Sequence, residues 1–306
     1  MMEVMVLERL IRLFFLASLA AVGLVACQTQ PTKVTETPII SFDKLSQQMA
    51  APMKITKDMV VVDVRSFFDY TMAHIPNSIN LSWEEFSQVE GAAPGLLKKD
   101  LALLTRHLAL KGIGPESRVL VVGKGLHGQG EEGRMAWTLF YLGVPQVQIA
   151  GIENFYKMLT NVKSTPLKNV KPWQPKTADV VLTSRNELLN AAMNPPKTVT
   201  QKIHILDVRS KKEYFHRKGK EFGKSYQTPN MKMMHIQWKE FFSANGQVQF
   251  NLKNKLLGVG VGINDRILVI SNKGIRSGAV TIALLAMGFK RAANYTGGYI
   301  QLLKGR

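Results

Sequence analysis

Cysteine is nearly absent from this chain, which has Cys27 as the only one in 306 residues. One cysteine cannot close a disulfide within the chain, so disulfide bonds do not contribute to the fold. The apolar run at residues 13–26 is also short, because its 14 residues carry no charge but end at Cys27. A bilayer core of about 30 Å needs a longer helix, so this run cannot span a membrane.

Residues 1–26 have the features of an export signal. Arg9 and Arg12 precede the apolar run, which ends in the sequence Leu-Val-Ala-Cys at residues 24–27. Small residues before a cleavage site fit a peptidase cleft. The four residues resemble the lipobox of bacterial lipoproteins, and this resemblance implies that Cys27 carries lipid and begins the exported chain. An ordinary secretory signal followed by an unrelated cysteine is the alternative.

Residues 27–37 are predicted to form a lipidated tether. The ten residues after Cys27, QTQPTKVTET, are polar and have no apolar period. Two or three acyl chains would anchor the protein stably in a membrane. Gln28, rather than an aspartate, follows the cysteine. In Gram-negative lipoproteins that residue implies the outer membrane, so we expect a cell-envelope protein that faces the periplasm.

Acidic residues are few, with 22 Asp and Glu against 40 Lys and Arg, and the net charge is +18. Nucleic acid is the usual partner of such a charge, but an exported protein seldom meets it, so we expect no nucleic-acid partner. Anionic lipid, lipid A phosphates or acidic glycans fit the predicted location better. A solvated basic surface without any partner is the alternative.

The chain contains an internal repeat. VVVDVRS at residues 60–66 matches HILDVRS at 204–210, and NLSWEEF at 80–86 matches HIQWKEF at 235–241. A third pair of blocks, at 112–122 and 260–270, consists of a turn that leads into an apolar run. Apolar runs of this kind are typical of buried parallel strands.

The repeat predicts two domains of similar fold. We place domain 1 at residues 38–165, a linker at 166–177 and domain 2 at 178–306. Each domain begins with a predicted helix, capped by Ser41 and by Ser184. Strands that alternate with helices predict an α/β fold in which each domain has a mostly parallel sheet with helices on both faces.

Both repeats resemble the rhodanese family of sulfurtransferases in its two-domain form. Domain 1 has DVRSFFDY at residues 63–70 and AHIPNSINL at 73–81, similar to the family signature DVR…EY…GHIPGA…N. Domain 2 has SNKGIRS at 271–277 and YTGGY at 295–299, similar to the family's active loop, Cys-x-x-Gly-x-Arg-Ser, and the Gly-Gly turn that follows it. The resemblance covers nearly all of the chain after residue 38.

The active-loop segment is the candidate binding site. A loop between a strand and a helix N-terminus points backbone N–H groups at its centre and favours an anion. In the family, a cysteine at the first position takes sulfur from a donor such as thiosulfate, holds it as a persulfide and passes it on, while the arginine steadies the anion. The anion-binding loop would consist of Ser271, Asn272, Lys273, Gly274, Ile275, Arg276 and Ser277.

Ser271 replaces the family's nucleophilic cysteine, and this departure decides the predicted function. A serine hydroxyl cannot carry a persulfide, and no Ser-His-Asp arrangement is readable around it. In domain 1 the corresponding position is Gly123, and the loop after it is longer. We therefore predict no catalytic residue and a protein that binds an anion, a peptide or an envelope protein. An active sulfurtransferase and a purely structural envelope lipoprotein are the alternatives.

Several other patterns suggest sites but are better explained by structure. Gly123-x-Gly125-x-x-Gly128 resembles a dinucleotide fingerprint but lacks the acidic residue expected about 20 positions later. The segment MKMMH at 231–235 could bind copper(I), but methionine more often packs in a core. The Asp-x-Arg pairs at 63–65 and 207–209 predict structural ion pairs. We therefore expect no metal and no cofactor.

Overall fold

The structure, a computed structural model, describes residues 41–89, 94–165, 169–193, 202–215, 218–221, 224–227 and 231–304. These residues belong to one compact unit of the chain, Ile40–Arg306. The predicted signal and tether, with Cys27, lie outside the described residues. Among the residues that are described, no helix is both long enough and apolar enough to cross a membrane.

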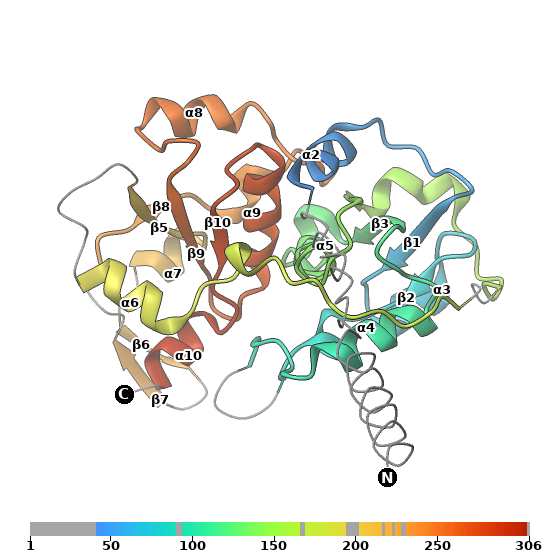
Figure 1. Cartoon of the computed structure of the whole chain (residues 1–306), viewed down its shortest axis with the longest axis horizontal. Coiled ribbons are helices and arrows are strands. Elements are labelled where there is room, and N and C mark those ends of the chain that lie inside the picture. Colours follow the sequence, from blue (N-terminus) through green and yellow to red (C-terminus); the bar gives the residue numbers. More distant parts are fainter. Residues whose placement is uncertain are drawn as a thin grey trace, which may run out of the picture. The chain divides into compact units, whose positions relative to one another are not determined.

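Domain 1 contains a parallel sheet of four strands in the order β2-β1-β3-β4 (Figure 1). The register pairs Asp63 with Asn80, so the first repeated block lies beside the start of the second. The strands are β1 (Met59–Asp63), β2 (Ile79–Asn80), β3 (Arg118–Gly123) and β4 (Val147–Gly151). The α-helices are α2 (Phe42–Ala50), α3 (Phe67–Met72), α4 (Leu101–Leu110) and α5 (Glu131–Tyr141), and the 3-10 helices include η1 (Trp83–Phe86), η2 (Gly125–His127) and η3 (Ile152–Met158).

Domain 2 repeats this sheet, with parallel strands in the order β10-β9-β5-β8. The strands are β5 (Ile203–Asp207), β8 (Met234–His235), β9 (Arg266–Ile270) and β10 (Ala292–Asn294). The α-helices are α6 (Arg185–Met193), α7 (Lys211–Phe215), α8 (Leu252–Gly258), α9 (Ile275–Ala286) and α10 (Gly298–Lys304), and the 3-10 helices are η4 (Asp179–Val181) and η5 (Trp238–Phe241). The predicted α/β class is confirmed.

An antiparallel hairpin between α7 and β8 was not predicted. Its strands are β6 (Lys218–Glu221) and β7 (Lys224–Gln227). Domain 1 passes from α3 to β2 through the short segment 73–78, which contains no named strand. The hairpin is therefore an insertion specific to domain 2: 24 residues separate Ser210 from His235, against 13 between Ser66 and Asn80. The extra length is visible in the sequence, but domain 1 has no matching segment from which its structure could be predicted.

The apolar strands are buried on both faces, as the sequence pattern predicts. In β1, Val62 packs in the core that lies on the side of α5, whereas Val61 packs in a separate core with Ile75 and Phe155. In domain 2, Val269 and Leu268 of β9 divide in the same way. Alternate residues of a strand point to opposite faces, so each sheet separates two hydrophobic layers.

The two predicted N-caps are present. The Ser41 hydroxyl accepts a hydrogen bond from the Lys44 amide at 3.2 Å, and the Ser184 hydroxyl accepts one from the Glu187 amide at 3.1 Å. Each bond satisfies an amide that has no acceptor within its helix. These caps set the start of α2 and α6, the first α-helix of each domain.

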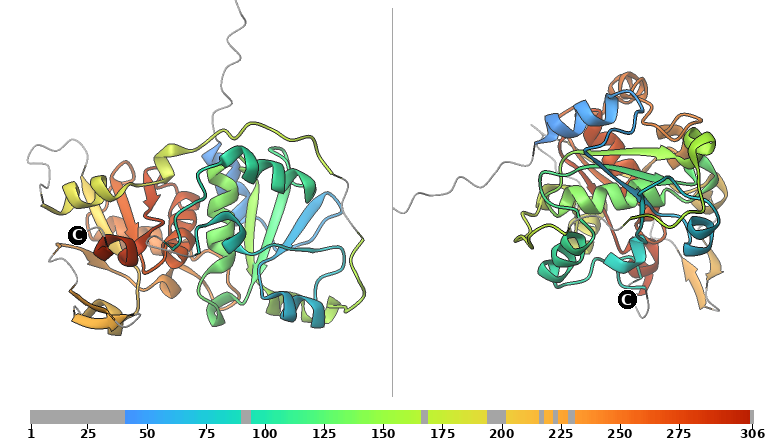
Figure 2. Two further views of the ribbon diagram at one scale, coloured as in Figure 1. Left: turned by 90° about the horizontal axis from the view of Figure 1, so that it is seen from below. Right: turned by 90° about the vertical axis from the view of Figure 1, so that its right-hand side faces the viewer.

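Helices α5 and α9 join the two domains by packing side by side (Figures 1 and 2). Gly133 of α5 makes this close approach possible, because a Cβ atom built there would lie 2.5 Å from the Cβ of Ala279 in α9. The hydrophobic core on this side of the sheets contains residues of both domains. The first turn of α9, which carries the candidate site, is therefore supported by domain 1.

The segment predicted as a linker lies along α4 where it is described. The Val170 amide donates to the Ala109 carbonyl at 3.1 Å, and the Thr105 hydroxyl donates to the Trp173 carbonyl at 2.8 Å. Trp173 also packs against the core. These contacts fix the path of the chain between the two domains.

Candidate functional site

The predicted loop connects β9 to α9 in domain 2. β9 ends at Ile270, and α9 begins at Ile275. Gly274 has a φ angle of 74°, and a Cβ atom there would lie 2.1 Å from the Thr296 carbonyl oxygen. A side chain at this position would therefore clash, and glycine is required. The amides of Ile275 and Arg276 precede the first hydrogen bond of the helix, so they have no acceptor within it.

Ser271 is almost fully buried, with 1% of its surface exposed. Its hydroxyl lies 3.0 Å from the Ser277 hydroxyl and accepts a hydrogen bond from the Ser277 amide at 3.2 Å. The Ser277 hydroxyl in turn donates to the Asn294 side-chain oxygen at 2.7 Å. These partners hold the serine in place, but none of them is a base that could deprotonate it. The geometry therefore gives Ser271 a structural role.

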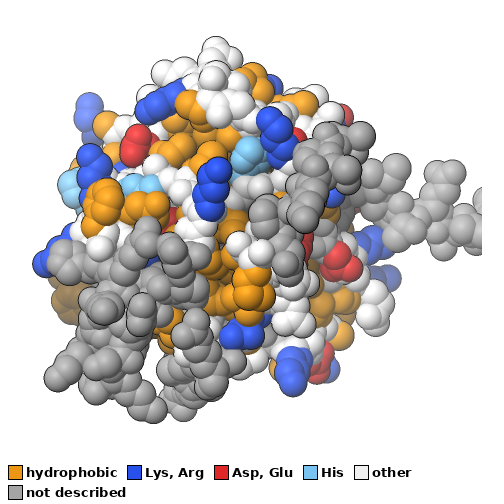
Figure 3. Space-filling view, turned by 90° about the vertical axis from the view of Figure 1, so that its left-hand side faces the viewer, with side chains coloured by type: hydrophobic (Ala, Val, Ile, Leu, Met, Phe, Trp, Pro, Cys, Tyr) orange, Lys and Arg blue, Asp and Glu red, His pale blue; other side chains and the backbone are white. Residues whose placement is uncertain are grey.

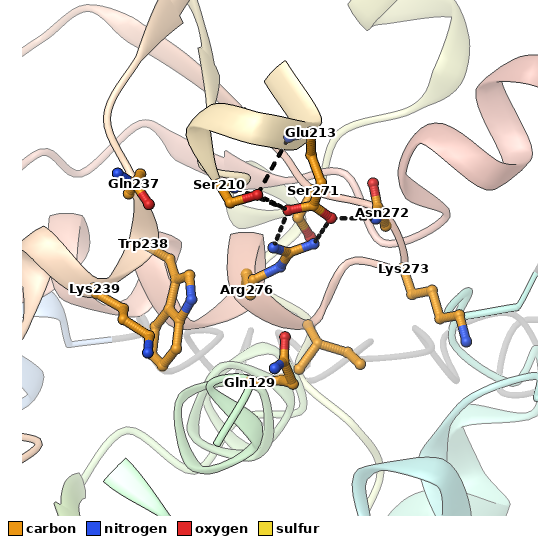
Figure 4. A pocket seen from close by; sticks show the side chains of 11 residues that line it. Gln129, Ser210, Glu213, Gln237, Trp238, Lys239, Ser271, Asn272, Lys273 and Arg276 are labelled. Carbon is orange, nitrogen blue, oxygen red and sulfur yellow. Dashed lines mark hydrogen bonds and ion pairs between the residues drawn. The ribbon is translucent and has the colours of Figure 1, made fainter. Parts of the chain in front are cut away.

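Arg276 is paired with Glu213, a residue that the sequence analysis did not include in the site. Nη1 and Nη2 of the guanidinium donate to the two carboxylate oxygens of Glu213 at 2.7 and 2.8 Å (Figure 4). Asn272 donates to the same carboxylate at 2.7 Å. Arg276 was expected to hold an anionic ligand, but the carboxylate of α7 already occupies both of its terminal nitrogens.

The pairing also changes the acidity of Glu213. Partial burial alone would raise the pKa of this carboxyl, but the hydrogen bonds from Arg276 and Ser210 outweigh it and lower the pKa to about 2. Ser210 contributes through both its amide, at 2.9 Å, and its hydroxyl, at 2.6 Å. Glu213 is therefore ionised at any physiological pH.

Replacing Glu213 by glutamine is expected to destabilise the protein near neutral pH but not in acid. The folded-state pKa lies below the ordinary value of 4.5, so the carboxylate contributes its stability above pH 4.5 and loses it as the pH falls toward 2. Denaturant unfolding of wild type and Glu213→Gln across this range should show a difference that shrinks with falling pH. The exposed Glu84→Gln variant is the control, and a constant difference for Glu213→Gln would contradict the ion pair.

The repeat contained a signal for Glu213. Asp69 occupies the matching position in domain 1, and its carboxylate lies 2.9 Å from the Lys124 ammonium. Lys124 directly follows β3, just as the domain 2 loop follows β9. The hydrogen bond from Lys124 lowers the pKa of Asp69. In both domains, therefore, the acidic residue three positions after the end of the Asp-Val-Arg-Ser block pairs with a cation in the segment that follows β3 or β9.

A pocket with a volume of ≈ 610 Å³ opens over this ion pair. Lys239 and Lys273 lie on opposite sides of Glu213 and Arg276, and Gln129 reaches the pocket from domain 1 (Figure 4). The pocket is lined by Gln129, Ser210, Glu213, Gln237, Trp238, Lys239, Ser271, Asn272, Lys273, Ile275 and Arg276. Five of the seven residues of the predicted anion-binding loop line the pocket, and Gly274 and Ser277 do not.

Arg134 of α5 contacts the backbone of the domain 2 loop. The sequence analysis did not identify this residue. The side chain is fully buried and donates to the Gly274 carbonyl at 2.9 Å, to the Gly95 carbonyl at 2.8 Å and to the Ser87 hydroxyl at 3.0 Å. The guanidinium also lies 5.0 Å from the centre of the Trp137 ring. A domain 1 cation therefore fixes the backbone of the domain 2 loop.

In domain 1, Gly123 stands at the position that corresponds to Ser271, and the side chain of Glu132 fills the space beside it. A Cβ atom built on Gly123 would lie 2.3 Å from Glu132 Oε2, an atom that is buried and has no hydrogen-bond partner. Burial raises the pKa of Glu132 to about 8, and the neighbouring Glu131 and Glu153 add to this effect. With this pKa the Glu132 carboxyl is neutral near pH 7.

The remaining sequence predictions can also be compared with the structure. Arg65 pairs with Asp63 at 2.6 Å and Arg209 pairs with Asp207 at 2.8 Å, so the structural ion pairs are confirmed. In the segment 231–235, Met231 and Met233 pack in one core, whereas Met234 packs against the other. This alternation confirms the interpretation of these methionines as packing residues.

The chain belongs to the rhodanese-like family. The family model described as rhodanese-like domain matches residues 44–157 and 186–303, one match in each domain. Comparison with the curated proteins gives no match. The assignment agrees with the two repeated sheets and with the position of the loop between β9 and α9.

Solved structures with the same fold include sulfur-transferring proteins. SseA from Escherichia coli, one of the 3-mercaptopyruvate sulfotransferases, shares 18% identity with a TM-score of 0.62, covering 84% of this chain and 97% of SseA. Tum1 from Saccharomyces cerevisiae shares 14% identity with a TM-score of 0.63, covering 82% and 90%. EanB shares 14% identity with a TM-score of 0.65, covering 87% and 67%. At these identities the likeness establishes the fold only.

Proposed function

We propose that this rhodanese-family protein binds an anionic ligand in the domain 2 pocket and does not transfer sulfur. The observation that carries the proposal is Ser271, which stands at the nucleophile position and is bound to Ser277. A hydroxyl cannot hold a second sulfur, and none of the described residues is a cysteine. The amides of the loop and the lysines at the pocket rim favour an anion there.

A thiosulfate:cyanide assay tests this proposal. Wild type should give the rate of the buffer blank, because no thiolate is available in the pocket. Ser271→Cys should give a low but measurable rate, because the loop amides and the helix N-terminus favour a thiolate and lower its pKa below the free value of about 8.5. A clear rate for the wild-type protein would overturn the proposal and favour an active sulfurtransferase.

We further propose that the protein is attached to a membrane of the cell envelope through lipid on Cys27, with the outer membrane as the expected location. The signal-like residues 1–26 and the Leu-Val-Ala-Cys sequence support this proposal. Ligand binding would then occur close to a membrane surface. If the pocket bound nothing, a purely structural lipoprotein would be the alternative, and crosslinking in intact cells would identify its neighbours.

Substituting Cys27 by serine is expected to abolish lipid attachment. In cells given a fatty-acid probe, the wild-type chain should be labelled, and Cys27→Ser should remain unlabelled and uncleaved, because serine offers no thiol for the diacylglycerol group. The matched control is Ser18→Ala within the apolar run, which should be labelled like wild type. Equal labelling of Cys27→Ser and wild type would exclude Cys27 as the lipidated residue.

A further inference from the structure

The positive charge of the chain is concentrated in domain 2. Residues 178–306 contain 21 Lys and Arg against 7 Asp and Glu, whereas residues 38–165 contain 13 against 12. The formal net charge is therefore +14 for domain 2 and +1 for domain 1. Figure 3 shows Lys and Arg side chains spread over one face of the molecule. Attraction for an anionic partner thus resides mainly in domain 2.

Two of these charges, one in the pocket lining and one next to it in the sequence, stand at positions where domain 1 has no cation. The repeat aligns Lys211 with Phe67 and Lys239 with Glu84. Lys211 is exposed and directly follows Ser210, which lines the pocket, while the exposed Lys239 is itself part of the lining. The two domains share their fold, so the fold does not require lysine at these positions.

The floor of the pocket has few groups that could bind a small anion. Both terminal nitrogens of Arg276 are bound to Glu213, whose own charge opposes an entering anion. The lysine ammonium groups of the lining lie on long side chains, with Lys239 and Lys273 on opposite sides of the ion pair (Figure 4). Cationic groups that are separated in this way favour a ligand with several negative charges over a single oxyanion.

The rest of the lining is neutral and suits a peptide backbone. Gln129 and Gln237 each have an amide that can donate and accept hydrogen bonds, and Ser210 has a hydroxyl that can do the same. Trp238 is buried, and its ring lies 5.8 Å from the Lys239 ammonium, so it positions that lysine beside the pocket. The volume of ≈ 610 Å³ lies within the range of pockets that enclose small ligands.

We propose that this pocket binds an acidic peptide segment of a partner protein, with Lys211 and Lys239 contacting its carboxylates and the glutamine amides contacting its backbone. The inference rests on the proposed function, because it names the class of ligand for the same pocket. It predicts binding that weakens as salt is added, since the rim charges are exposed to solvent.

The test uses the full-length protein in detergent and a fluorescent, end-blocked peptide of alternating glutamate and glycine. Fluorescence anisotropy should show binding that is lost when glutamine replaces every glutamate of the peptide. The double variant Lys211→Gln/Lys239→Gln should bind about fivefold more weakly, because each exposed ion pair contributes modestly. The control Lys54→Gln/Lys57→Gln removes two exposed lysines of domain 1 and should bind like wild type.

Two further probes separate the possible failures. If the acidic peptide does not bind but sulfate raises the melting temperature more for wild type than for Lys211→Gln/Lys239→Gln, the peptide inference is wrong and the proposed anion site stands. If micelles containing phosphatidylglycerol bind in a lysine-dependent way and the peptide does not, the rim recognises lipid instead and the inference is overturned. If no probe binds, the proposed function fails as well.

Discussion

Glu132→Gln is expected to stabilise the protein by about 3 kcal/mol near neutral pH. In the wild type the Glu132 carboxylate must take up a proton when the protein folds, which costs free energy at this pH, whereas glutamine needs no proton. The ordinary pKa of 4.5 is raised to about 8 in the folded state. Between these values the unfolded chain loses the proton while the folded chain keeps it. Stability of the wild type therefore falls as the pH rises from 4.5 to 8, and glutamine removes this dependence.

Denaturant unfolding at a series of pH values measures the effect. The difference between Glu132→Gln and wild type should be small below pH 4.5, should grow as the pH rises and should level off above 8. Glu116→Gln, which changes an exposed glutamate of the same domain, should show no such dependence. A difference that does not vary with pH would mean that Glu132 is ionised in the folded protein.

Arg134→Ala is expected to lower the free energy of unfolding by about 4 kcal/mol, since it removes a buried, hydrogen-bonded charge and leaves a cavity. The buried carbonyls of Gly95 and Gly274 and the buried hydroxyl of Ser87 would each lose a hydrogen bond, although Gly274 would still accept from the Gly278 amide and the Asn294 side chain. The domain 2 loop would also lose its support from domain 1. Chemical denaturation measures the loss of stability.

The exposed Arg106→Ala provides the matched control for this substitution, because it removes the same kind of side chain from the surface of α4. Its unfolding free energy should stay within about 0.5 kcal/mol of wild type. A second readout is peptide or sulfate binding by Arg134→Ala under conditions where it remains folded, which should be weaker because Gly274 loses its hydrogen bond from domain 1. Unchanged stability of Arg134→Ala would show that the guanidinium does not join the domains.

The architecture of the two sheets was predictable because the same strand-forming blocks occur twice in the sequence. The apolar runs that end in Asp-Val-Arg-Ser become the central strands β1 and β5, each paired with the strand formed by the third repeated block. The left-handed Gly274 and the caps Ser41 and Ser184 are local features, readable within a few residues. The β6–β7 hairpin was missed because domain 1 has no counterpart for it.

Contacts between distant residues explain what could not be predicted at the site. Glu213 and Arg276 are 63 positions apart, and Arg134 and Gly274 are 140 positions apart. The sequence showed that Arg276 belongs to the loop, but it did not show that a carboxylate neutralises it. The burial of Glu132 next to Gly123 likewise depends on the orientation of α5 relative to the end of β3. No local sequence pattern predicts that orientation.

The central claim is that the domain 2 loop retains the rhodanese form and lacks only the atom that carries sulfur. The most direct test is the mass of the intact protein after exposure to thiosulfate and removal of the excess. The account predicts that wild type keeps its mass and that Ser271→Cys gains one sulfur atom, which dithiothreitol removes. A sulfur adduct on the wild-type protein, or none on Ser271→Cys, would contradict it.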